Sequence, residues 1–101
     1  MINSGVINKF KEEGNLRRYG YTVSESPYNM SDVQRQQLLR NLINEDKISA
    51  YEIEDHLRML IRLNSNRFDY RSAVQKWKRD LYFVEQLYDD GSVQLSVENY
   101  M

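Results

Sequence analysis

The chain has 101 residues, of which 41% are hydrophobic and 29% charged, and its formal net charge is −1. These values predict one globular domain, residues 1–101, and exclude a disordered chain. The charge balance gives no bulk attraction for nucleic acid, and the absence of cysteine excludes disulfides, thiolate zinc sites and cysteine nucleophiles.

The first residues lack the basic-then-apolar pattern of a signal peptide. No apolar run approaches the roughly 20 residues that cross a bilayer. We therefore expect a cytoplasmic protein that does not interact with a membrane.

The N-terminal third predicts one short helix and one short strand. In residues 4–13, apolar side chains recur at helical spacing on one face. In residues 18–23, Tyr19, Tyr21 and Val23 alternate with polar residues or glycine, which is typical of a strand.

Two helix-start signatures predict the strongest elements. Ser31 stands three residues before Gln34, and Ser49 stands three residues before a glutamate, which is the spacing of a capping box. The predicted helices cover residues 32–45 and 50–63. Their inward residues are Leu38, Leu39, Leu42 and Ile43 in the first and Ile53, Leu57, Leu60 and Ile61 in the second.

The longest predicted helix covers residues 69–88. Its apolar residues are spaced four, three, four, three and four apart, which makes a narrow heptad-like seam. We expect this seam to face its own domain. The alternative is that the seam packs against another chain, which includes a second copy of this protein in a homo-oligomer. The seam consists of Tyr70, Val74, Trp77, Leu81, Val84 and Tyr88.

A second strand is predicted at residues 93–97, which alternate in the same way. We expect it to pair with residues 18–23, whereas pairing with a partner's sheet edge is the alternative. The predicted fold is therefore α+β and mostly α: a small helical bundle of three to four helices with a two-stranded sheet.

No constellation of residues indicates catalysis. His56 is the only histidine, and its nearest candidate partner is Glu52, one turn earlier. The chain has no nucleophile motif and no glycine-rich phosphate loop. We expect a protein that is not an enzyme, with no catalytic residues, metal, cofactor or small-molecule substrate.

Two surfaces are candidates for binding a macromolecule. Exposed tyrosine beside arginine is typical of protein-binding surfaces, and eight tyrosines cannot all be buried. The predicted partner-binding residues are Arg17, Arg18, Tyr19, Tyr21, Asp89 and Asp90. The alternative is contact with nucleic-acid phosphates through Arg71, Lys78 and Arg79, although the acids that begin the 50–63 helix would repel a duplex.

Residues 18–97 resemble a helical module that recurs in bacterial and phage-type proteins and has no assigned activity. The resemblance implies that these elements form one domain, and it transfers no functional residue. Small proteins of this type favour a non-enzymatic protein-binding function: an inhibitor of a host defence protein from a phage or mobile element, anti-CRISPR-like or another anti-defence protein. A small nucleic-acid-binding domain or regulator is the alternative. The motifs that carry the resemblance are Tyr19-Gly20-Tyr21-Thr22-Val23, Arg35-Gln36-Gln37-Leu38, Ser49, Glu52-Ile53, His56-Leu57, Ala73-Val74, Lys76-Trp77, Asp80, Phe83-Val84, Gly91-Ser92-Val93 and Val97.

Overall fold

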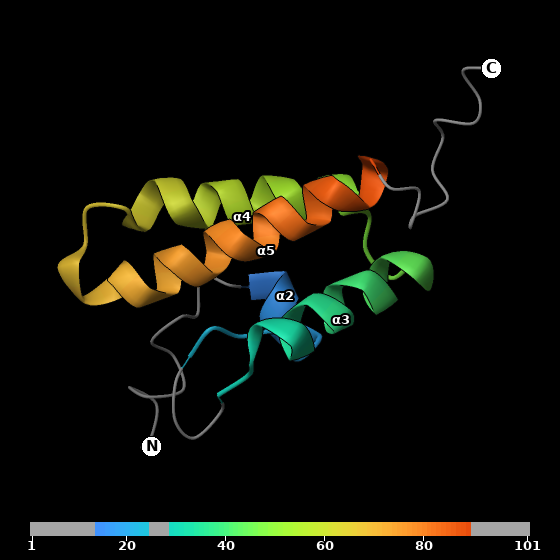
Figure 1. Ribbon diagram of the computed structural model, residues 1–101, viewed down its shortest axis with the longest axis horizontal. Coiled ribbons are helices and arrows are strands. Elements are labelled where there is room, and N and C mark those ends of the chain that lie inside the picture. The colour runs from blue at the N-terminus through green and yellow to red at the C-terminus, as the bar shows by residue number, and fades with distance from the viewer. Residues whose placement is uncertain (1–13, 25–28, 90–101) are drawn as a thin grey trace.

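The computed structural model describes residues 14–24 and 29–89 (Figure 1). This part of the chain is mostly helical, which confirms the predicted helical bundle. The predicted helix at 4–13 and strand at 93–97 lie outside it. The elements are α2 (Gly14–Arg18), α3 (Asp32–Asn44), α4 (Ala50–Asn64), the short 3-10 helix η2 (Phe68–Tyr70) and α5 (Arg71–Asp89).

Helix α5 is the centre of the arrangement. It runs back along α4 after the turn through η2, and α3 packs against it as well (Figure 1). Helix α2 packs near the start of α4, where a Cβ added at Gly14 would lie 3.5 Å from the His56 ring. None of the described helices is both long and apolar enough to cross a membrane.

Both predicted capping boxes are present. The Ser31 hydroxyl accepts a hydrogen bond from the Gln34 amide at 3.0 Å, and the Gln34 side chain accepts one from the Ser31 amide at 2.9 Å. Ser49 and Glu52 make the same reciprocal pair at the start of α4. The helices predicted at 32–45 and 50–63 are therefore confirmed to within one residue at each end.

The predicted seam of the long helix faces the inside of its own domain. Trp77 and Val84 are fully buried, and Tyr70 and Val74 are nearly so. Leu81 is partly buried against the same cluster, whereas the Tyr88 side chain lies outside the described part. Ala73 and Leu87 join the core from the neighbouring positions of α5.

The predicted strand at residues 18–23 is wrong. Arg18 ends α2, and Gly20 takes a positive φ of 100° that L-residues rarely adopt. The Gly20 amide donates to the Arg17 carbonyl at 2.9 Å and the Tyr21 amide to the Leu16 carbonyl at 3.0 Å, which are the two bonds of a Schellman helix end. No described residue belongs to a sheet, so the predicted two-stranded sheet has no support.

Candidate functional site

A buried ionic cluster joins three parts of the chain. The Asp80 carboxylate on α5 accepts hydrogen bonds from the Tyr21 hydroxyl at 2.6 Å and from Arg35 Nε at 2.7 Å. The Gln36 amide donates to the other Asp80 oxygen at 3.1 Å. Tyr21 and Asp80 are 0% exposed and Arg35 is 1% exposed. The cluster thus fixes α3 and the segment after α2 against α5.

The cluster continues to the surface through Asp32. This carboxylate contacts the Arg35 guanidinium and also accepts two bonds from Arg79, at 2.8 and 3.2 Å. The hydrogen bonds from Arg79, and then those from Arg35, hold the pKa of Asp32 below its ordinary value despite some desolvation. Burial acts against the charge of Arg35, but Asp80 and then Asp32 together outweigh it and raise the pKa of Arg35. Positive and negative side chains therefore alternate along the cluster, in the order Arg79, Asp32, Arg35 and Asp80.

The predicted partner-binding residues do not form one exposed surface. Tyr21 is wrong as a contact residue, because it is buried and bonded to Asp80. Tyr19 is 38% exposed and its hydroxyl donates to the Lys47 carbonyl at 3.4 Å, while Arg18 is exposed and Arg17 partly buried. The Asp89 side chain and the whole of Asp90 lie outside the described part.

Several residues of the motifs that carry the resemblance hold the fold together. Tyr21, Arg35, Gln36 and Asp80 belong to three separate motif segments, and the structure brings them together. Sequence reasoning missed this cluster. The signal in the sequence was a charged residue at an inward position of a helix, Arg35 in α3 and Asp80 in α5. Asp80 lies between Trp77 and Val84 on the buried side of α5.

A groove of about 500 Å³ lies between α3 and α5 on the outside of this cluster. Tyr82 is 63% exposed beside the partly buried Phe83. The partly buried Arg40 places its guanidinium 5.6 Å from the centre of the Phe83 ring, within the range of a cation–π contact. The groove is lined by Gln36, Lys78, Arg79, Tyr82, Phe83 and Gln86.

The predicted phosphate-binding residues are divided between two places. Lys78 and Arg79 line the groove. Arg71 is two turns earlier, about 10 Å along the helix axis, and its guanidinium lies over the Phe68 ring at 5.4 Å. These three residues therefore do not form one compact cation cluster.

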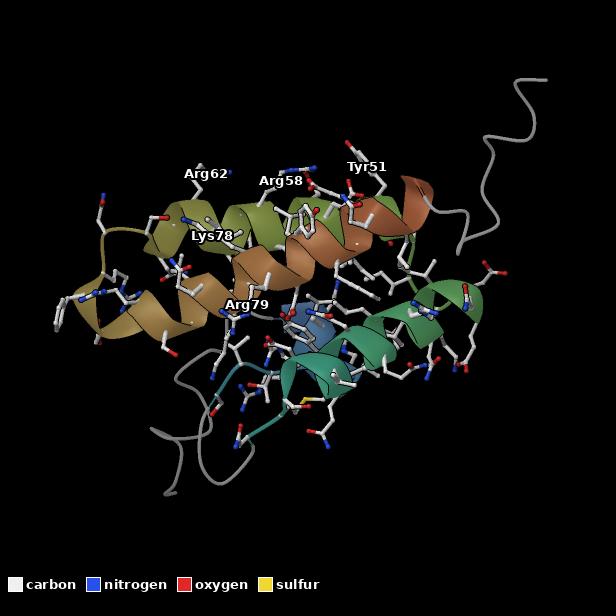
Figure 2. The ribbon with its side chains drawn as sticks, in the orientation of Figure 1. Tyr51, Arg58, Arg62, Lys78 and Arg79 are labelled. Atoms are coloured by element: carbon white, nitrogen blue, oxygen red, sulfur yellow. The ribbon has the colours of Figure 1, made fainter. Side chains whose placement is uncertain are left out.

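Further cations follow the outer side of α4. Figure 2 shows Arg58 and Arg62 projecting from α4 on the side away from α3, with Lys78 and Arg79 on α5. Arg58 is bound to Glu54 at 3.3 Å and to Glu85 at 3.1 Å. Burial acts against its charge, but the bond to Glu85, and then Glu54, raises the pKa of Arg58.

A smaller depression of about 260 Å³ lies where α2 meets the start of α4. His56, Glu52 and Asp55 are among its lining residues. Within residues 14–24 and 29–89, these three and the other histidine, aspartate and glutamate side chains are not placed so that three of them could hold one metal ion. The predicted absence of catalysis, metal and cofactor stays a prediction.

Comparison with known proteins leaves these contacts as the basis for assigning function. No protein-family description, curated protein or solved structure matches this chain.

Proposed function

We propose that this chain is a non-catalytic protein-binding domain and that its contact surface is the groove between α3 and α5. The observation that supports the proposal is Tyr82, which is 63% exposed beside Phe83 and flanked by Lys78 and Arg79. Aromatic side chains and arginine are enriched in the residues that dominate protein–protein binding energy.

Nucleic acid is the second candidate, since Lys78 and Arg62 are exposed and have no ion pair among the described residues. Two other cations are already neutralised inside the chain, however. Arg79 is bound to Asp32 through two hydrogen bonds, and Arg58 contacts two carboxylates. A phosphate would have to displace these partners, which lowers the gain from counterion release. The groove therefore favours a protein partner.

The partner that we propose from the type of protein, which is small, free of cysteine and without a catalytic motif, is a host defence protein, with this chain acting as its inhibitor. A phage or mobile-element origin would account for a small domain that carries one binding surface. The neighbouring genes supply an independent check, because an anti-defence protein is expected beside others of that class.

Two matched tyrosines provide the test. Tyr82 lies in the groove, whereas Tyr51 is 68% exposed near the start of α4, away from α3 (Figure 2). The wild-type chain, Tyr82→Ala and Tyr51→Ala are each immobilised and exposed to lysate of the source organism, and retained proteins are identified by quantitative mass spectrometry.

We expect at least one protein that wild type and Tyr51→Ala retain and that Tyr82→Ala loses by about tenfold. Because Tyr82 is exposed, circular dichroism and the unfolding midpoint of Tyr82→Ala should equal those of wild type. The same retained proteins on all three columns would contradict the proposed surface. Retention of nucleic acid, with no protein that depends on Tyr82, would favour the second candidate.

A further inference from the structure

We infer that the occupant of the groove is an acidic amphipathic helix of the partner protein, with large apolar residues on one face and carboxylates beside them. This inference rests on the proposed protein-binding function and adds the chemistry of the ligand. It follows from the charges along the groove, from one incompletely bonded arginine and from the length of the groove.

The charges along the groove are mostly positive. Lys78 and Arg79 line it, whereas Arg40 packs on the ring of Phe83 without itself lining the groove. Asp32, the carboxylate bonded to the lining residue Arg79, also contacts Arg35. Asp80 is fully buried within its own hydrogen bonds. Both charged residues that line the groove are therefore cations, and Lys78 has no ion pair among the described residues, which favours an acidic segment.

Arg40 has an unused donor. Its Nε is buried and has no hydrogen-bond partner among the described residues. The guanidinium packs on the ring of Phe83, a residue that lines the groove. A buried donor without an acceptor is costly, and a carboxylate accepts from a guanidinium through strong charge-assisted bonds. Arg40 does not itself line the groove, so a carboxylate of the ligand reaches this donor only after the Arg40 side chain moves.

The length and floor of the groove fit a helix. Its α5 residues extend from Lys78 to Gln86, which is about 12 Å along the axis. About two turns of a ligand helix can contact this length, through apolar anchors at i, i+3 or i+4, and i+7. Tyr82 and Phe83 provide the aromatic surface for these anchors, while Lys78, which has no ion pair among the described residues, reaches a carboxylate beside them.

The experiment selects ligands without assuming a partner. A random library of peptides of about 16 residues, long enough for about four turns, is displayed on phage and selected on the wild-type chain. Counter-selection uses Tyr82→Ala. We expect the enriched peptides to be net acidic, to carry leucine, phenylalanine or tryptophan at helical spacing, and to become helical when bound. Enrichment of neutral or basic peptides would overturn the inference.

A charge reversal with a matched control measures the electrostatic part. Binding of the best selected peptide, labelled with fluorescein, is followed by anisotropy for wild type, Lys78→Glu and Arg62→Glu. Arg62 is an exposed cation on α4, outside the groove. We expect Lys78→Glu to weaken binding by about tenfold or more and Arg62→Glu by less than about threefold. Equal losses would assign the effect to net charge and contradict the inference.

The inference and the proposed function can fail separately. If proteins are captured through Tyr82 but the selected peptides are not acidic, the function stands and the ligand chemistry is wrong. If neither proteins nor peptides depend on Tyr82, the surface itself is wrong. A duplex DNA probe that binds with steep salt dependence, while no peptide is enriched, would assign the cations to phosphate contact and overturn both.

Discussion

Replacing Asp80 by asparagine should remove a large part of the stability of this domain. Asp80 is fully buried and is the shared acceptor for Arg35, Tyr21 and Gln36. Breaking a buried ion pair by removing one partner costs about 3–5 kcal/mol, because the other charge stays buried. Arg35 keeps its bond to the Met30 carbonyl at 2.8 Å and its contact with Asp32, so we expect the free energy of unfolding to fall by about 3 kcal/mol, the lower end of this range.

Trp77 makes this loss measurable. It is the only tryptophan and is 0% exposed, so its fluorescence reports unfolding of the core directly. A domain of this size has a total stability of about 5–15 kcal/mol. At an m-value of about 1.5 kcal/mol/M, a loss of about 3 kcal/mol lowers the urea midpoint by about 2 M.

A double-mutant cycle tests whether the cluster acts as a unit. Tyr21→Phe alone removes one hydrogen bond to a charged acceptor and should cost about 1.5–3 kcal/mol. Combined with Asp80→Asn, it should cost less than the sum of the two, with a coupling energy of about 1 kcal/mol or more. An Asp80→Asn protein within about 1 kcal/mol of wild type, or an additive cycle, would refute the view that Asp80 holds Tyr21 and Arg35 in place.

Three smaller changes test other contacts. Asp32→Asn should destabilise the domain at pH 7, because the pKa of Asp32 is lowered in the folded state. A lowered pKa contributes stability above the unfolded value, about 3.9, that is lost as the pH falls through the folded value, so urea midpoints of the two proteins should converge below about pH 4. A difference that stays constant down to pH 2 would contradict this. Ser49→Ala removes the cap of α4 and should cost about 1 kcal/mol, seen by calorimetry as a melting temperature about 4–8 °C lower; an unchanged melting temperature would show that the cap is dispensable. Asp46 has a φ of 59°, so Asp46→Gly should raise stability by about 0.5–1 kcal/mol, and a lower urea midpoint would exclude strain there.

The helices could be predicted because their signals are local. Each capping box lies within four residues of sequence, and the periodicity of α5 appears within its own length. The same local reasoning was wrong at residues 18–23. Alternating tyrosines there belong to a Schellman helix end, in which Tyr21 packs back with Leu16 into the core. A β-strand and a helix end can therefore have the same alternating sequence pattern.

The candidate site could not be predicted in the same way. Tyr21 was assigned to the surface because exposed tyrosine is common in binding sites, but its partner Asp80 is 59 positions away. The burial of Arg35 could not be predicted either, because the carboxylate that pairs with it, Asp80, lies on another helix. Lys78 and Arg79 were found from the sequence, whereas their grouping with Tyr82 and Phe83 depends on how α3 packs against α5.

The separation between Tyr21 and Asp80 also affects how the protein is made. At about 5–20 residues per second, a ribosome needs about 3–12 s to add the 59 residues between them. For the last 45 of these residues Arg35 is present without Asp80 to neutralise it, and until residue 77 is added the chain lacks the tryptophan of its core. Final assembly must wait for the last long helix. Nascent chains that stall before it are expected to expose apolar surface and to depend on chaperones.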